Sequence, residues 1–188
     1  MQNRDDHEFR TRTVIYNMLI TRKYNVKSCD EIINCGESFL THKNGNTTDK
    51  IYIFFPQNSS KVGVLAIRQY IKDMQSANTE RAIIVVKEEI TAFAKQIFTE
   101  TKQIIEYFKE NEILIDITQH ILVPKHELLD EEEKKELLSV YNIKELNLPK
   151  ILGSDPVSKY FGARKGQVFK ITRNSESSGK TVYYRVVV

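Results

Sequence analysis

The sequence predicts an α+β protein made of two small α/β units, and three observations indicate this class. Two continuous apolar runs of strand length, at residues 51–55 and 82–86, enclose a segment with helical spacing, which is the pattern of a β-α-β crossover. Residues 154–162 carry both the start and the stop signals of a short helix. The stretch from Thr181 to Val188 is rich in β-branched and aromatic residues and follows a run of turn residues, as in a terminal β-hairpin.

Length and composition are consistent with two units. The 188 residues are enough for two small domains with their own cores, which we place at residues 1–118 and 119–188. A composition of 40% hydrophobic and 28% charged residues is typical of a soluble globular protein. No apolar run approaches the roughly 18 residues of a membrane span, and the first residues are charged where a signal peptide is apolar. We therefore expect no membrane partner and a location inside the cell.

The first helix is predicted over residues 5–24, where apolar residues recur at helical spacing. Its apolar face contains Phe9, Val14, Ile15, Met18 and Leu19. Its basic residues are expected to form a solvated face rather than a DNA contact, and they are Arg4, Arg10, Arg12, Arg22 and Lys23. A second helix is predicted over residues 28–43, with Ser28 as its cap, and a loop over residues 44–48.

A mixed sheet is predicted at the centre of the first unit. Its strands are expected at residues 51–55, 82–86 and 104–108, and its helices at 62–74 and 91–101. Residues 110–118 fit a helix or a strand. In such sheets ligands bind beyond the carboxyl ends of the strands, here at the loops that begin at Pro56 and Lys87.

The second unit begins with a short apolar run, residues 122–126, that is interrupted by Pro124. A helix is expected to start at Asp130, with Glu133 as the reciprocal capping partner. Its buried stripe is predicted to contain Leu137, Leu138 and Tyr141.

The rest of the second unit is predicted from residues that typically start or end helices and turns. Asp155 is expected to cap a two-turn helix that has Pro156 in its first turn and Gly162 just past its end. Gly166 then leads into the hairpin, which we predict as strands at residues 167–173 and 181–188 joined by a turn at 174–180.

Basic residues are concentrated after Pro149, although the net charge of the chain is only +3. They are Lys150, Lys159, Arg164, Lys165, Lys170, Arg173, Lys180 and Arg185, against Asp155 and Glu176. This excess fits a phosphate-binding face, and it equally fits a solubilising hairpin edge that blocks unwanted strand pairing. Both interpretations stay open.

No arrangement of residues indicates catalysis. The nearest acid and lysine set for a metal-dependent nuclease, Asp49, Lys50, Glu88 and Glu89, lacks metal-ligand spacing. His120 and His126 have no acid or cysteine partners at ligand spacing, so we interpret them as surface or hinge residues. Cys29 and Cys35 fit neither a zinc site nor a disulfide framework and are expected to be reduced thiols. We therefore predict no metal, no cofactor, no small-molecule substrate and no enzymatic activity.

Four aromatic residues near the C-terminus have two possible roles. Tyr160, Phe161, Tyr183 and Tyr184 could form a base-stacking platform. Core packing is favoured for most of them, because they lie on a short helix and on alternating hairpin positions.

Four motifs of the second unit, in this order and spacing, resemble the fifth common subunit of nuclear RNA polymerases, whose C-terminal part resembles a small subunit of the archaeal RNA polymerase. They are LVPKH at 122–126, SDPVSKYFG at 154–162, KGQVFKITR at 165–173 and TVYYRVVV at 181–188. Upstream, the resemblance continues through TDKIYIFFP at 48–56, KVGVLAIRQY at 61–70 and RAIIVV at 81–86, and it weakens over the first 45 residues or so. The family usually has a further strand before residue 48, which the resemblance implies is trimmed here.

The resemblance implies a non-catalytic structural subunit of DNA-dependent RNA polymerase. The C-terminal domain would be an assembly domain that anchors to the largest subunit, through Asp155, Pro156, Tyr160, Arg164, Lys165, Gly166 and Arg173. The N-terminal domain would be a nuclease-like jaw that lines the downstream DNA channel. The implied location is the nucleus, or the cytoplasm or virion if the source is a large DNA virus.

The DNA-proximal residues that the resemblance implies are Lys87, Thr91 and Lys95. They form a loop that runs into a helix N-terminus, where backbone amides can hold a phosphate. This chain departs from the family pattern, which commonly has proline at the position of Ala92, and the adjacent acids Glu88 and Glu89 oppose a phosphate. We therefore expect only weak contact with duplex DNA. The alternative function is a free-standing nucleic-acid-binding regulatory protein that uses the basic C-terminal face.

Overall fold

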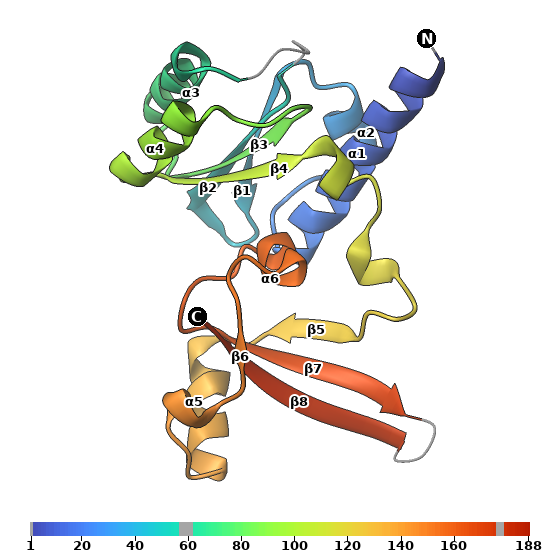
Figure 1. The fold of residues 1–188 in the computed structure, drawn as a ribbon, viewed down its shortest axis with the longest axis vertical. Coiled ribbons are helices and arrows are strands. Elements are labelled where there is room, and N and C mark those ends of the chain that lie inside the picture. Colours follow the sequence, from blue (N-terminus) through green and yellow to red (C-terminus); the bar gives the residue numbers. More distant parts are fainter. Residues whose placement is uncertain (1, 57–61, 176–178) are drawn as a thin grey trace. The chain divides into compact units, whose positions relative to one another are not determined.

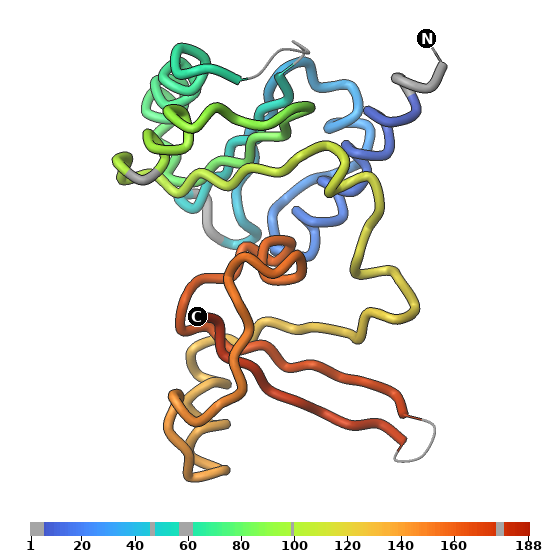
Figure 2. Tube along the Cα trace, in the orientation of Figure 1, coloured from blue at the N-terminus to red at the C-terminus, as the bar shows by residue number. Residues whose placement is uncertain are grey.

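Each half of the chain builds its own four-stranded sheet (Figure 1). The computed structural model describes residues 2–56, 62–175 and 179–188, whose path is traced in Figure 2. The chain divides into two compact units, Met1–Ile115 and Asp116–Val188, which we call the N-terminal and C-terminal units. The predicted α+β class, with helices and strands mixed in both units, is confirmed.

The sheet of the N-terminal unit is mixed, as predicted. Its strands, in spatial order, are β1 (Ser38–Lys43), β2 (Asn46–Phe54), β3 (Arg81–Val86) and β4 (Ile104–Lys109). Strand β1 pairs antiparallel with β2, whereas β2, β3 and β4 are parallel. The predicted β-α-β crossovers are confirmed, because α3 (Val64–Ser76) and α4 (Ala92–Glu100) connect the parallel strands.

Helices cover both faces of this sheet (Figure 1). Parallel crossovers are almost always right-handed, so successive crossovers in one direction place α3 and α4 on the same face. There they bury a core that includes Phe54, Ile67, Met74 and Ile84. On the other face lie α1 (Gln2–Thr21) and the short α2 (Cys29–Ile33).

The helix predicted over residues 28–43 forms only in part. Helix α2 follows its predicted cap Ser28 but ends at Ile33, and residues 38–43 form the strand β1 instead. The predicted loop at 44–48 is reduced to the Asn44-Gly45 turn, since β2 begins at Asn46. Gly45 has a φ of 79°, which favours glycine, and pairing with β2 supplies the hydrogen bonds that keep this segment extended.

The solvated basic face predicted for the first helix is also wrong at two positions. The Arg12 side chain is only 5% exposed, and its Nη1 donates to the Ile32 carbonyl at 2.8 Å. The Arg22 side chain is 4% exposed and pairs with Glu106 of β4 at 2.7 Å. Phe9, predicted in the core, is 54% exposed. Arg12 reaches inward because its guanidinium donates hydrogen bonds to several backbone carbonyls at and after the end of α2.

The thiol of Cys35 provides a pH test of this region. Burial raises the pKa of Cys35 above its ordinary value of 9.0, outweighing the lowering effect of the nearby Arg12 guanidinium. In a Cys29→Ser chain we expect iodoacetamide to react more slowly with folded than with unfolded Cys35. The ratio of the unfolded to the folded rate should be constant well below pH 9 and should fall toward one as the pH rises through the folded pKa, because Cys35 is then a thiolate in both states. Equal midpoints in the two pH–rate profiles would contradict this.

The C-terminal unit contains the predicted terminal hairpin. Its sheet has the order β5 (Lys125–Leu128), β7 (Val168–Ser175), β8 (Gly179–Val187) and β6 (Lys150–Ile151). Strands β7 and β8 are antiparallel and form the hairpin, β5 is antiparallel to β7, and β6 is parallel to β8. The hairpin strands extend further than predicted, and residues 176–178 of the predicted turn lie outside the described residues.

Both predicted helices of the C-terminal unit are confirmed, each on its own face of the sheet. Helix α5 (Glu131–Val140) begins at Asp130, whose amide donates to Glu133 at 2.9 Å. On this face of the sheet Leu137, Leu148, Val168 and Val186 are buried, with Leu138 partly buried beside them. Tyr141, predicted in the buried stripe, is instead 59% exposed. Helix α6 (Pro156–Phe161) covers the opposite face, where Phe161 packs on a core of Ile151, Phe169, Ile171 and Val187.

Short 3-10 turns complete the chain. Residues 110–118, for which helix and strand were both open, contain η1 (Glu110–Glu112) and η2 (Ile117–Gln119). A third turn, η3 (Glu145–Asn147), follows α5. Over residues 2–56, 62–175 and 179–188, none of the helices combines the length and apolarity needed to cross a bilayer.

Candidate functional site

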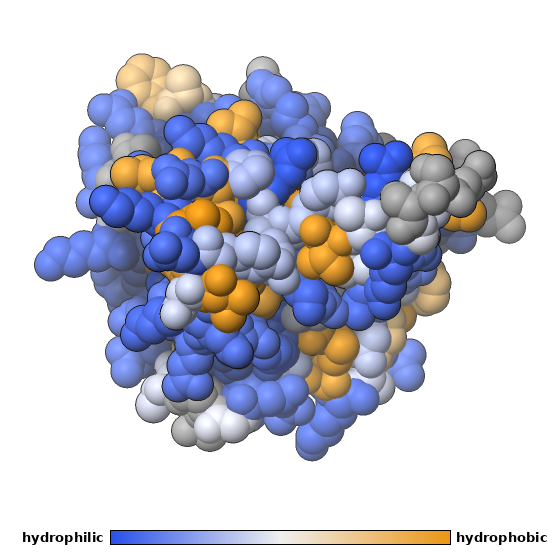
Figure 3. Space-filling model, turned by 90° about the horizontal axis from the view of Figure 1, so that it is seen from below, coloured by the Kyte–Doolittle hydropathy of each residue, from blue (hydrophilic) through white to orange (hydrophobic). Residues whose placement is uncertain are grey.

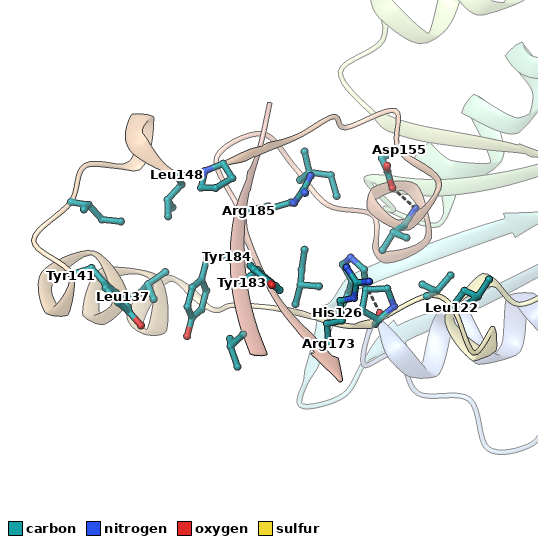
Figure 4. Close-up of a pocket in the computed structure, with 18 residues that line it drawn as sticks. Leu122, His126, Leu137, Tyr141, Leu148, Asp155, Arg173, Tyr183, Tyr184 and Arg185 are labelled. Carbon is teal, nitrogen blue, oxygen red and sulfur yellow. Dashed lines mark hydrogen bonds between the residues drawn. The ribbon is translucent and has the colours of Figure 1, made fainter. Parts of the chain in front are cut away.

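A groove of about 870 Å³ opens on the C-terminal unit (Figure 4). Its floor is the outer part of β8, including Tyr183 and Tyr184. One wall is formed by Leu137 of α5 and by Tyr141, which directly follows that helix, and the other includes Leu122 and His126. The lining is mainly apolar and aromatic and carries two arginines, Arg173 and Arg185. Such a surface suits a protein segment better than a small polar molecule, because aromatic and arginine side chains are enriched in protein interfaces.

Four of the predicted partner-binding residues offer surface to a partner. Pro156 at the start of α6, Arg164 and Lys165 in the turn after it, and Arg173 on β7 are all exposed. The Arg164 amide donates to the Gln167 side chain at 2.7 Å, which fixes the backbone of this turn while leaving both basic side chains in solvent. Only Arg173 of these four lies on the groove itself.

The other three predicted partner-binding residues hold the surface in shape. Tyr160 is 3% exposed, and its hydroxyl contacts Asp116 Oδ2 at 3.3 Å, which connects α6 to η2. Gly166 has a φ of 88°, and its carbonyl accepts from Lys134 Nζ at 2.6 Å. Asp155 lines the groove, and its Oδ1 accepts from the Val157 amide at 2.9 Å.

Two substitutions at Asp155 test whether this residue stabilises α6 as a helix cap. We expect Asp155→Ala to lower the free energy of unfolding by about 1 kcal/mol, because the Val157 amide loses its acceptor. Asp155→Asn keeps a capping oxygen and should stay within about 0.5 kcal/mol of the natural chain. Urea unfolding followed by circular dichroism measures both. Equal losses for the two variants would show that the charge, and not the cap, stabilises α6.

The predicted DNA-proximal residues lie together at the carboxyl end of β3 and the start of α4. Lys87 is exposed directly after β3, and Thr91 is the N-cap residue of α4. Lys95 is exposed on the first turns of α4, with its Nζ 5.5 Å from the centre of the Tyr107 ring. The acid Glu89 pairs with Lys109 at 2.6 Å, which raises the pKa of Lys109. Part of the negative charge that opposed a phosphate here is therefore neutralised.

The acid and lysine set considered for a nuclease is separated by the fold. Asp49 lies before the parallel-paired part of β2, which begins with Ile51 opposite Arg81, and Asp49 pairs with Lys43 at 3.9 Å. Glu88 follows the far end of β3, roughly 20 Å along the strand direction at about 3.3 Å per residue. Within the described parts of the chain, no three His, Cys, Asp or Glu side chains are grouped so that they could hold a metal ion.

Core packing is confirmed for most of the four aromatic residues, whereas the prediction for the histidines is too simple at His126. Tyr160 is buried, while Phe161 and Tyr184 pack against the two cores of the unit, so core packing holds for three of the four aromatic residues. Tyr183 is the exception, with 50% exposure. His126 is more than a surface residue, because its ring packs edge-on against Phe169 at 5.9 Å between ring centres.

Known proteins resemble the chain over nearly its whole length. The family model of the RNA polymerase Rpb5 C-terminal domain matches residues 115–187. The DNA-directed RNA polymerases I, II, and III subunit rpabc1 of Dictyostelium discoideum is 43% identical over 189 residues, which cover 94% of this chain and 95% of that protein. RPABC1 of Caenorhabditis elegans is 42% identical over 153 residues, which cover 80% of this chain and 72% of that protein. The DNA-directed RNA polymerase subunit 5-like protein 1 of Arabidopsis thaliana is 34% identical over 200 residues, with 96% and 95% coverage.

These matches define the class: the chain is a non-catalytic subunit of a DNA-directed RNA polymerase, and its partners are other polymerase subunits. Within that class, the chain belongs to the family of RPABC1, or Rpb5. The predicted resemblance to the fifth common subunit is therefore confirmed.

Proposed function

We propose that the C-terminal unit anchors this chain to the largest subunit of nuclear RNA polymerases I, II and III, and that the N-terminal unit lines the channel of the downstream DNA. The observation that carries the anchoring is the exposed basic set Arg164, Lys165 and Arg173, of which Arg173 lines the groove, in the unit that matches the family model. Exposed charges beside an apolar groove favour a protein surface with acidic residues, because complementary charges fix the orientation of a docking partner.

Charge reversal tests the anchoring. In a chain with Arg164→Glu, Lys165→Glu and Arg173→Glu, we expect a tagged protein to recover at least about tenfold less largest subunit from a nuclear lysate. The fold should persist, because all three side chains are exposed. A matched control carries the same charge change at the exposed residues Lys72, Lys102 and Lys135 and should recover the natural amount. Equal recovery by both triple variants would refute anchoring through this basic set.

The DNA-facing role rests on Lys87, Thr91 and Lys95, which place two exposed cations beside the N-terminus of α4. A helix N-terminus with exposed lysines attracts phosphate, and a polymerase channel would present phosphate as duplex DNA. We expect a photoreactive side chain at position 87 or 95 to cross-link to downstream DNA in the assembled polymerase. The same probe at Lys72, on α3, should not. If neither position 87 nor position 95 cross-linked to DNA, the proposed contact between this loop and downstream DNA would be contradicted.

A further inference from the structure

The hairpin leaves one long strand edge open. Strand β8 pairs with β7 along its whole length, from Gly179 opposite Ser175 to Val186 opposite Val168. On its other side β6 pairs only with Val186 and Val187. Within the part of the chain that the structure describes, no strand pairs with residues 179–185 on that side.

The backbone groups that face this open edge can be identified from alternation. The Val186 amide donates to the Pro149 carbonyl at 2.8 Å, on the β6 side, whereas the Val187 amide donates to Gln167 at 2.9 Å, on the β7 side. Since neighbouring residues of a strand point their amide and carbonyl groups to opposite edges, those of Tyr184 and Val182 face the open side. Among the described residues they have no backbone partner.

Proteins usually block such an edge, because unpaired strand groups template the pairing of another chain. Here the open stretch contains no proline and only one lysine, Lys180, at its outer end. Two of its side chains, Val182 and Tyr183, are 40% and 50% exposed. Figure 3 shows that hydrophobic side chains lie in separate patches among hydrophilic ones on the face of the molecule seen from below. The open edge is therefore available to a partner strand.

The groove offers two different environments to such a strand, one on each face of the sheet (Figure 4). The face toward α5 is apolar and aromatic, with Leu137, Tyr141 and Tyr184. The other face carries the exposed arginines Arg173 and Arg185. The one acid among the groove residues, Asp155, already accepts a hydrogen bond from the Val157 amide. A strand added to β8 would alternate its side chains between these environments.

We propose that the open edge of β8 binds an extended segment of another polymerase subunit as an additional strand, with apolar side chains toward α5 and acidic side chains toward Arg173 and Arg185. Main-chain hydrogen bonds to Val182 and Tyr184 supply the pairing, and the alternate side chains supply the specificity. This inference rests on the proposed function, since it states how the anchoring partner is held. Unlike the proposed function alone, it predicts that the backbone amides of Val182 and Tyr184 become protected from hydrogen exchange in the complex.

Hydrogen exchange in the assembled polymerase tests the added strand. The Val182 and Tyr184 amides should exchange quickly in the free chain and at least about tenfold more slowly in the complex. The amides of Thr181 and Tyr183 face β7, so their exchange should change much less and they serve as internal controls. Mass spectrometry with residue-resolved fragmentation of the segment 179–187 reads all four. Incorporation into the polymerase with no slowing at 182 and 184 overturns the added strand while leaving the proposed function intact. Failure to incorporate overturns both.

A proline variant provides the second measurement. Val182→Pro removes the one amide proton that faces the open side at this position, and edge strands tolerate proline there. We expect a melting curve close to that of the natural chain and about tenfold weaker retention of the largest subunit. If this variant unfolds, Arg173→Glu combined with Arg185→Glu should weaken retention on an intact fold, because both side chains are exposed.

A second copy of the chain is the competing occupant of the edge. Under the proposal, sedimentation of the free chain should give a monomer with fast exchange at Val182 and Tyr184. A dimer that protects these two amides would overturn the assignment to another subunit.

Discussion

Replacing Arg12 by alanine is expected to destabilise the N-terminal unit by about 3 kcal/mol, because several hydrogen bonds from one charged, buried guanidinium are lost together. The Arg12 guanidinium donates to the backbone carbonyls of Ile32, Ile33, Cys35 and Gly36. It also pairs with Glu8 at 2.7 Å and lies 4.5 Å from the centre of the Phe55 ring. Without it, the carbonyls of Ile33 and Gly36 lose this donor, and the Ile32 carbonyl keeps the Cys35 thiol at 2.9 Å. Helix α1 also loses these hydrogen bonds to the segment before β1.

The expected loss should appear in the urea transition of the N-terminal unit, followed by exchange of its core amides. Arg10→Ala is the matched control, because Arg10 lies two residues earlier on α1 and is exposed. It should change stability by no more than about 0.5 kcal/mol. Arg12→Lys should recover little, since an ammonium group cannot reproduce the planar fork that reaches several carbonyls. Equal stabilities of the Arg10→Ala and Arg12→Ala chains would contradict the role of Arg12.

Replacing Phe169 by alanine is expected to cost the C-terminal unit a similar amount, about 3–5 kcal/mol, because it leaves a cavity in a small core. Phe169 has no exposed surface and is the second residue of β7. Its ring packs edge-on against Phe161 of α6, at 5.5 Å between centres, and against His126 of β5. Truncation therefore separates the sheet from α6, the helix that carries Pro156.

The measurement is thermal unfolding of the C-terminal unit together with recovery of polymerase subunits by the tagged chain. Tyr183→Ala is the matched control, because it also truncates an aromatic side chain in the hairpin, but one that is half exposed. Tyr183 lies on β8, two residues before the position that pairs with Phe169. It should cost less than about 1 kcal/mol in stability. If Phe169→Ala retained the melting temperature of the natural chain, the core described for α6 and β7 would be incorrect.

Much of the C-terminal unit could be predicted because its signals are local. Asp155, Pro156 and Gly162 mark the ends of α6 through backbone preferences that act within one turn. The same holds for Asp130 and Glu133 at the start of α5. Patterns of this kind depend little on distant residues, so sequence alone identifies them.

The failures in the N-terminal unit have a common physical cause. Strand β1 is held by its pairing with β2, a partner that helical spacing over residues 28–43 does not reveal. Arg12 and Arg22 were assigned to solvent because arginine is mostly exposed, yet carbonyls and an acid from distant segments receive them. The open edge of β8 could not be predicted either, because it depends on how little of β8 is covered by β6.

Affinity purification of the natural chain from a nuclear lysate, followed by quantitative mass spectrometry, tests the central claim most directly. We predict that the largest subunits of the polymerases are recovered in equal molar amounts with the tagged chain, at salt concentrations that remove nucleic acid. The Arg164, Lys165 and Arg173 charge-reversal chain should lose them. Recovery of the natural chain as a free 21.9 kDa protein, without polymerase subunits, would contradict the account.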